Sequence, residues 1–154
     1  MDSIELHPIG RVVSAREKPQ NDHWDDVSCS IHIDPQRFSP DSLAGLSDFS
    51  HILVVFYFHL ADPKKIENTA RHPRNNQDWP KVGIFAQRNK NRPNQIGVTV
   101  CGLERVEGHV IHVKGLDAIM DTPVLDIKPW FVEYGPRGET RQPVWVQELM
   151  KNYW

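Results

Sequence analysis

A run of cationic and amide side chains stands out in this chain, because such groups bind anions. Residues 82–94 read Val-Gly-Ile-Phe-Ala-Gln-Arg-Asn-Lys-Asn-Arg-Pro-Asn, a short apolar start typical of a strand followed by a polar loop. Pro93 fixes its own backbone and biases Arg92 toward an extended conformation, and Asn94 tolerates the left-handed region that a tight reversal requires. We interpret the run as a stiffened loop that presents Arg88, Arg92 and Asn94. The alternative is a solvent-exposed hairpin tip.

A second stretch, residues 114–130, carries more charge than a short turn and strand require. It reads Lys-Gly-Leu-Asp-Ala-Ile-Met-Asp-Thr-Pro-Val-Leu-Asp-Ile-Lys-Pro-Trp. In one interpretation Asp126 and Lys128 form a same-face pair on a strand, and Asp121 begins a turn. In the other, the carboxylates of this stretch face the cationic loop across a cleft.

The charge of the chain is distributed unevenly. Residues 64–92 hold eight basic and two acidic side chains, a net charge of +6, whereas the whole chain carries −2 and the remainder therefore −8. One side of the molecule is expected to attract an anion, such as a nucleic acid or a phosphorylated ligand. A pI near 6.4 argues against a generic, sequence-independent nucleic-acid binder.

Several familiar kinds of site have no pattern here. His109 and His112 are three apart in a predicted strand and face opposite sides, and the other histidines lack ligand spacing, so we expect no metal site. Cys29 and Cys101 lie in alternating apolar segments and are predicted to be buried core residues. The Gly-x-Ser-x-Gly, Gly-x-Gly-x-x-Gly and phosphate-loop motifs are missing from the sequence. We therefore do not expect the usual hydrolase fold or the usual nucleotide-binding folds.

The elements around these stretches are mainly short strands. Residues 27–33 alternate between polar and apolar side chains, which predicts a half-buried strand. Residues 51–60 are apolar on both faces and predict a central strand. Gly108 is predicted to lie in a turn. Residues 64–81 show no period and predict a long basic loop. Further strands are predicted at residues 4–16, 82–86, 96–103, 109–113 and 123–128. An amphipathic helix, packed on the barrel or on a second subunit, is predicted at 142–154. This composition favours one domain over residues 1–154, a mainly β barrel or sandwich.

The sequence also bears on location and assembly. It contains no apolar run of membrane-spanning length, and its first residues are too polar for a signal peptide, so we expect a soluble, cytoplasmic protein. A homodimer is predicted from the large side chains near the end of the chain, and intramolecular packing is the alternative. These side chains are Trp145, Leu149, Met150, Tyr153 and Trp154.

The two dense stretches resemble a known family, the TrmO-like (TsaA-like) methyltransferases. The family pattern Phe-Ala-Thr-Arg-Ser-x-x-Arg-Pro-Asn-Pro-Ile-Gly is similar to residues 85–97. The pattern Leu-Asp-x-x-x-x-Thr-Pro-Val-x-Asp-Ile-Lys-Pro-Tyr is similar to residues 116–130. Shorter matches at residues 9–12, 45–51 and 71–74 extend the resemblance over most of the chain. Departures from the family pattern are Gln87, Gln95, Trp130 and residues 23–26, which stand roughly where the family has Pro-Arg-Gln.

The resemblance implies a small β-barrel that binds S-adenosylmethionine near the interface of a homodimer, and a short form without the C-terminal domain of longer bacterial members. Members methylate N6 of threonylcarbamoyl-adenosine at position 37 of certain tRNAs. Whether residues 24–26 replace the Pro-Arg-Gln contacts stays open. By position, the resemblance implies cofactor contacts from His59, Leu60, Arg88, Gly115, Leu116 and Asp117.

The leading hypothesis is therefore a tRNA methyltransferase whose basic loop holds the anticodon loop, with bases stacked on aromatic rings. Phosphates would meet Arg71, Arg74, Arg88 and Arg92. Asp126 is the candidate general base, and Arg92 and Asn94 complete the predicted catalytic set. Two alternatives stay open, a methyltransferase that acts on a small molecule and a non-catalytic module that binds the cofactor or RNA.

Overall fold

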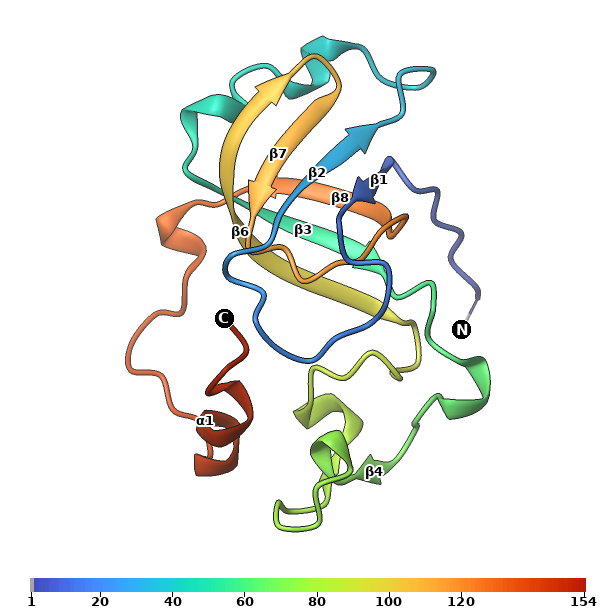
Figure 1. Ribbon diagram of the computed structural model, residues 1–154, viewed down its shortest axis with the longest axis vertical. Coiled ribbons are helices and arrows are strands. Elements are labelled where there is room, and N and C mark those ends of the chain that lie inside the picture. Colours follow the sequence, from blue (N-terminus) through green and yellow to red (C-terminus); the bar gives the residue numbers. More distant parts are fainter. Residues whose placement is uncertain (1) are drawn as a thin grey trace.

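The structure, a computed structural model, describes residues 2–154. Within that range, six antiparallel strands close into a barrel in the order β1-β2-β7-β6-β3-β8 (Figure 1). These strands are β1 (Gly10–Val13), β2 (Ser28–Ile33), β3 (His51–Tyr57), β6 (Ile96–Glu107), β7 (Val110–Lys114) and β8 (Pro123–Pro129). The mainly β, small-barrel fold predicted from the sequence is confirmed.

Alternation along the strands fills the barrel with apolar side chains. In β3, which lies between β6 and β8, Ile52, Val54 and Phe56 are at most 2% exposed and point inward. Burying one such side chain contributes about 1.5–3 kcal/mol to the free energy of folding. Gly97 faces Phe56 in the register, and a Cβ there would lie 2.5 Å from the Phe56 ring, so glycine makes room for the phenyl group.

The residues between β3 and β6, 58–95, form a separate lobe at one end of the barrel, which we call the basic lobe (Figure 1). The sequence predicts a long loop here, and the structure adds a two-stranded sheet of β4 (Ala70–Arg71) and β5 (Val82–Gly83). The strand predicted from residue 82 is thus only two residues long. Short 3-10 helices lie in the lobe at Pro63–Lys65, Pro73–Asn75 and Ile84–Ala86, and elsewhere at Pro40–Leu43, Leu46–Asp48 and Val132–Tyr134.

The helix predicted near the end of the chain is present but packs differently than expected. It is α1 (Val144–Met150), and its Trp145 ring lies 6.4 Å from the Trp79 ring of the basic lobe. Trp79 Nε1 also donates to Glu148 Oε2 at 2.6 Å. The helix therefore docks on the basic lobe of the same chain, whereas the sequence predicts docking on the barrel or on a second subunit.

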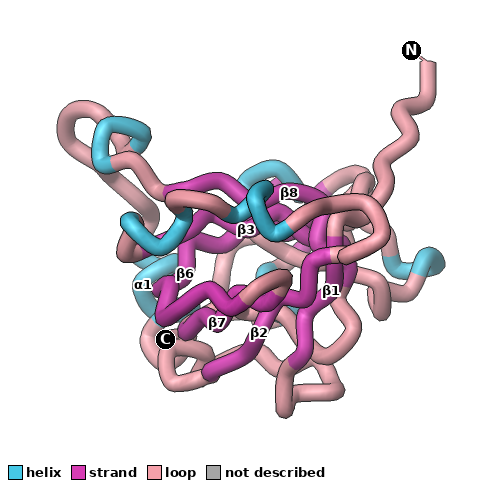
Figure 2. Tube along the Cα trace, turned by 90° about the horizontal axis from the view of Figure 1, so that it is seen from above, coloured by secondary structure: helices cyan, strands magenta, loops and turns pink. Residues whose placement is uncertain are grey.

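Some predicted boundaries are wrong. Strand β1 begins at Gly10 rather than at residue 4, and β3 ends at Tyr57 rather than at residue 60. The left-handed residue of the 92–95 turn is Gln95, with φ of 52°, and not Asn94. The strands gather in the centre of the molecule and the loops surround them (Figure 2). In the part of the chain that the structure describes, every helix is too short or too polar to cross a membrane.

Candidate functional site

Asp117 lies in the turn that follows β7, at one end of the barrel. Gly115 opens this turn with a left-handed φ of 79°, which glycine adopts without steric cost. Its N–H donates to the carbonyl of Val27 at 3.0 Å, so the turn is tied to the start of β2. Leu116 is fully buried in the barrel core, which fixes the backbone that carries Asp117.

Two hydroxyl groups bind the Asp117 carboxylate. Thr99, an inward-facing residue of β6 that is 5% exposed, donates to Oδ1, and Tyr153 donates to Oδ2. Strand β6 also anchors Arg88, whose Nη2 donates to the carbonyl of Val98. Because Val98 and Thr99 are consecutive, β6 holds Arg88 and Asp117 at the same end of the barrel.

The phenol of Tyr153 lies among groups of both charges. Burial, followed by the Asp117 carboxylate, raises the pKa of Tyr153 above its ordinary value, while the guanidiniums of Arg88 and Arg74 act in the opposite sense. The phenol therefore remains a protonated donor at neutral pH. We call Arg88, Thr99, Asp117 and Tyr153 the Asp117 cluster.

The loop between β1 and β2 packs beside this cluster. The N–H groups of His23 and Trp24 donate to the carbonyls of Asn152 and Tyr153 at 2.9 and 2.8 Å. The Arg16 guanidinium lies 4.2 Å from the centre of the Trp24 ring, a cation–π contact. Trp24 is 3% exposed, and its indole Nε1 has no acceptor among the described residues. A buried donor without an acceptor is rare and costly, and it marks a place where a ligand atom could bind.

An ion pair joins the basic lobe to the same loop. Arg74 Nη2 lies 2.7 Å from Asp22 Oδ1, and both side chains are 27% exposed. Arg71 donates to the Asn75 side chain at 2.5 Å. The lobe is thus held beside the Asp117 cluster, and the charge of Arg74 is partly compensated by Asp22.

In the described part of the chain, no hydrogen bond or ion pair joins Arg92 or Asn94 to the Asp117 cluster. Arg92 is half-buried, and its Nη1 donates to the carbonyl of Gln87 at 3.0 Å, so the guanidinium turns back onto its own loop. Gln87 is itself buried and donates to the carbonyls of Arg71 and Val82. Asn94 is exposed. Arg92 therefore folds back onto the loop and does not project from it as the sequence predicts, and the catalytic roles of Arg92 and Asn94 stay predictions.

Three other predicted site residues, His59, Leu60 and Asp126, form no hydrogen bond with the Asp117 cluster among the described residues. His59 and Leu60 form the turn after β3, where the His59 N–H donates to the carbonyl of Tyr57 and Leu60 is 54% exposed. Asp126 lies on β8 opposite Val55 and pairs with Lys128 at 2.7 Å, which is the same-face pair of the first interpretation. Its role as a general base stays a prediction.

Both cysteine thiols are buried in the barrel core. Burial is the main cause that raises the pKa of the Cys29 thiol, and likewise that of Cys101, to about 12, which keeps both protonated. Across residues 2–154, no three side chains of His, Cys, Asp or Glu come close enough together to hold a metal ion.

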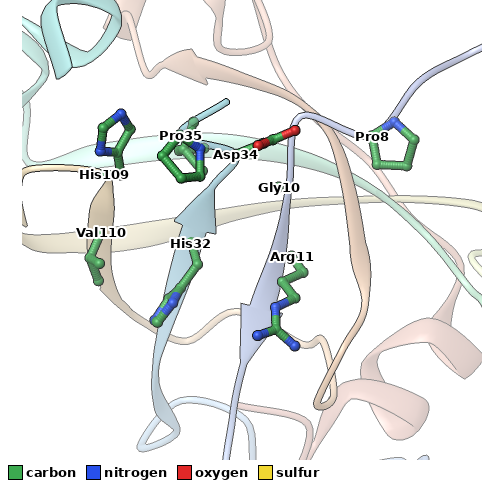
Figure 3. Close-up of a pocket in the computed structure, with 9 residues that line it drawn as sticks. Pro8, Gly10, Arg11, His32, Asp34, Pro35, His109 and Val110 are labelled. Carbon is green, nitrogen blue, oxygen red and sulfur yellow. The ribbon is translucent and has the colours of Figure 1, made fainter. Parts of the chain in front are cut away.

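A pocket of about 550 Å³ lies at the other end of the barrel, where β2 ends and β7 begins (Figure 3). His109 and His32 line it, but His109 Nε2 contacts the carbonyl of Phe38 at 2.7 Å, and His32 Nε2 contacts Ser30 Oγ at 3.0 Å. One nitrogen of each ring, Nε2, is therefore used within the fold. The pocket contains none of the site residues predicted from the sequence.

Comparison with known proteins identifies the family of this chain. A family model described as the tRNA-methyltransferase O N-terminal domain matches residues 14–135, a range that includes Trp24, Arg88, Thr99 and Asp117. The chain belongs to this family. The recognition of TrmO-like motifs in the sequence is thereby confirmed.

Individual relatives are consistent with this assignment. The tRNA (adenine(37)-N6)-methyltransferase of Homo sapiens is 40% identical over 111 residues, which are 72% of this chain and 25% of the human protein. The chain thus spans about a quarter of that relative's length. A probable S-adenosyl-L-methionine-binding protein of Methanothermobacter thermautotrophicus is 34% identical over 88% of this chain and 96% of its own. The crystal structure of TrmO from Pseudomonas aeruginosa superimposes with a TM-score of 0.74 and 27% identity, over 91% of this chain and 61% of that one.

Sequence reasoning found Arg88, Gly115, Leu116 and Asp117 for this end of the TrmO-family barrel and missed Thr99 and Tyr153. A threonine at an inward-facing position of an otherwise apolar strand was the available signal for Thr99. Tyr153 was assigned only to the apolar face of a helix. Its hydroxyl contact joins positions that are 36 residues apart and leaves no trace in local spacing.

Proposed function

We propose that this chain transfers a methyl group from S-adenosylmethionine to N6 of threonylcarbamoyl-adenosine 37 in tRNA. The proposal is supported by membership in the TrmO N-terminal domain family, together with the Asp117 cluster at the end of the barrel. The observation that carries it is the anchoring of Arg88 and Asp117 through two consecutive residues of β6.

The residues of the cluster fit the chemical groups of the cofactor. A carboxylate such as Asp117 accepts hydrogen bonds from an ammonium or from ribose hydroxyls, and a guanidinium such as Arg88 binds a carboxylate. The buried indole N–H of Trp24 offers a donor that has no acceptor among the described residues. Gly115 would supply backbone groups of the turn, which Leu116 holds from the barrel core, and His59 and Leu60 would contact the cofactor from the turn after β3.

When bound, the cofactor supplies an electrophilic methyl carbon on a sulfonium centre. The contribution of the chain is to hold the acceptor nitrogen in line with that carbon and to keep water away, since positioning provides most of the acceleration of such a displacement. Thr99 and Tyr153 orient Asp117, and the buried Trp24 ring excludes water from its side of the cluster.

The basic lobe is the proposed binding surface for the tRNA anticodon loop. It carries the net positive charge of residues 64–92, and its Phe85 is 81% exposed, which suits a base that stacks on an aromatic ring. Lysines of the lobe that are available for phosphates are Lys64, Lys65, Lys81 and Lys90.

We also propose a homodimer, on the basis of an apolar strip on the outer face of the barrel. Val98 and Val100 of β6 are 36% and 38% exposed, and they pair in register with the outward-facing Val55 and Leu53 of β3. The strip begins at Val98, whose carbonyl binds Arg88. A second copy docked on it would lie next to the cluster.

The test is methyl transfer from labelled S-adenosylmethionine to a tRNA that carries threonylcarbamoyl-adenosine 37. We expect label in that tRNA and none in the same tRNA transcribed without the modification, with the methylated nucleoside identified by mass spectrometry. Label that appears only in a small-molecule extract would favour the small-molecule alternative. Cofactor binding without transfer to any acceptor would favour the non-catalytic module.

A further inference from the structure

The last residues of the chain return to the end of the barrel where Asp117 lies. After α1, the C-terminus comes to rest beneath the barrel, next to the loop between β1 and β2 (Figure 1). The Tyr153 hydroxyl donates to Asp117 Oδ2, and its carbonyl accepts the N–H of Trp24 at 2.8 Å. A single residue therefore joins the Asp117 turn to the β1–β2 loop, although these lie in different parts of the sequence.

The loop that the tail holds has two features that packing alone does not explain. His23 adopts a left-handed φ of 63°, which a residue with a Cβ rarely does, and its N–H is held by the carbonyl of Asn152. The neighbouring Trp24 is 3% exposed and keeps an indole N–H without an acceptor among the described residues. Strained backbone clusters at ligand sites, and a buried donor without an acceptor requires an explanation such as a ligand.

We propose that residues 152–154 form a wall of the cofactor site and that Tyr153 is its positioning residue. The Tyr153 hydroxyl orients the carboxylate of Asp117, and the Tyr153 carbonyl holds the loop from which Trp24 donates its indole N–H to an acceptor atom of the cofactor. This inference rests on the proposed function. It assigns to the tail a role that family motifs in residues 85–97 and 116–130 do not cover.

The chemistry of the contact is compatible with a bound ligand. An ionised carboxylate has about four acceptor positions, and the two hydroxyl donors leave others available for an ammonium or a ribose hydroxyl. Burial keeps the phenol of Tyr153 protonated because it raises its pKa. The neutral phenol thus orients the carboxylate as a donor, whereas a phenolate could not donate and would repel the carboxylate.

The experiment compares the native chain with Tyr153→Phe by calorimetric titration with S-adenosylmethionine. The phenylalanine variant keeps the ring and the backbone carbonyl and removes only the hydroxyl, so we expect about tenfold weaker binding of the cofactor, or ~1.4 kcal/mol. With modified tRNA as acceptor, KM for the cofactor should rise while KM for the tRNA stays the same. Tyr134→Phe is the matched control, because Tyr134 is 81% exposed, and its affinity should equal that of the native chain.

Hydrogen exchange distinguishes a C-terminal tail that lines the cofactor site from a tail that blocks the site and is displaced by the cofactor. If the tail is a wall, the amides of His23 and Trp24, which donate to the tail, should exchange more slowly when the cofactor is added. Faster exchange on addition of cofactor would mean that the ligand displaces the tail, and this would overturn the inference. Equal affinities of the native chain and Tyr153→Phe would also overturn it and leave the proposed function standing, whereas a native chain that binds no cofactor would overturn both.

Discussion

The Thr99 hydroxyl donates a hydrogen bond to Asp117, across a separation of 18 positions in the sequence. Thr99 lies on the inward face of β6 and is 5% exposed, so the contact is made at the edge of the barrel core. A rigid strand therefore orients the carboxylate that the second family motif contributes. The same strand anchors Arg88 one residue earlier, through the carbonyl of Val98.

Asp117→Asn should weaken the binding of S-adenosylmethionine by about 10- to 100-fold, since hydrogen bonds to a charged group contribute ~1.5–3 kcal/mol. Calorimetry measures the affinity directly. Asp121→Asn is the matched control. Asp121 belongs to the same motif, residues 116–130, but it is an exposed turn residue that pairs with Arg11. Equal loss of affinity in both variants would contradict a specific role for Asp117.

Arg92→Ala should lower both the stability of the chain and the methylation of tRNA. Arg92 Nη1 donates to the carbonyl of Gln87, and loss of this bond should cost about 1 kcal/mol of the free energy of unfolding. Thermal unfolding and KM for tRNA are the measurements. Arg92→Lys should recover part of both, because lysine keeps a donor but loses the planar guanidinium. Native stability and native KM in the alanine variant would show that the loop does not depend on this residue.

The two thiols should resist modification in the folded chain. Burial raises the pKa of Cys29 and Cys101 from 9.0 to about 12, so the thiolate is scarce at pH 8 and a disulfide reagent should react only after unfolding in urea. Because the folded pKa values are raised, the stability linked to these thiols is fully present below pH 9 and is lost as the pH rises toward 12. Rapid labelling of the native chain at pH 8 would contradict their burial in the barrel.

Light scattering should give the mass of a dimer for the native chain at micromolar concentration. Val100→Glu places a charge in the outer apolar strip opposite Leu53 and should yield a monomer. Val132→Glu is the control, since Val132 is 81% exposed and does not belong to the strip. A native monomer, or a dimer that survives Val100→Glu, would contradict this interface.

The barrel could be predicted from the sequence because its strands alternate with period two. Residues Cys29, Ile31 and Ile33 point inward as the pattern indicates, and the turn at Gly108 is where it was expected, with φ of 60°. The resemblance to the family motifs likewise placed Asp117 in a turn. Local periodicity carries this information because each strand buries one face independently of its partners.

Contacts between distant segments could not be predicted in the same way. The Tyr153 contact with Asp117, the Arg74 pair with Asp22 and the docking of Trp145 on Trp79 each join parts of the chain that have no shared pattern. The orientation of Arg92 was also missed, because the proline next to it constrains the backbone but not the guanidinium.

The central claim, that the Asp117 end of the barrel binds S-adenosylmethionine, is tested most directly by titrating the native chain with the cofactor in a calorimeter, in the presence of a metal chelator. We predict saturable binding of one cofactor per chain, unchanged by the chelator and weakened in Asp117→Asn. The absence of any heat of binding at millimolar cofactor, or native affinity in Asp117→Asn, would contradict the account.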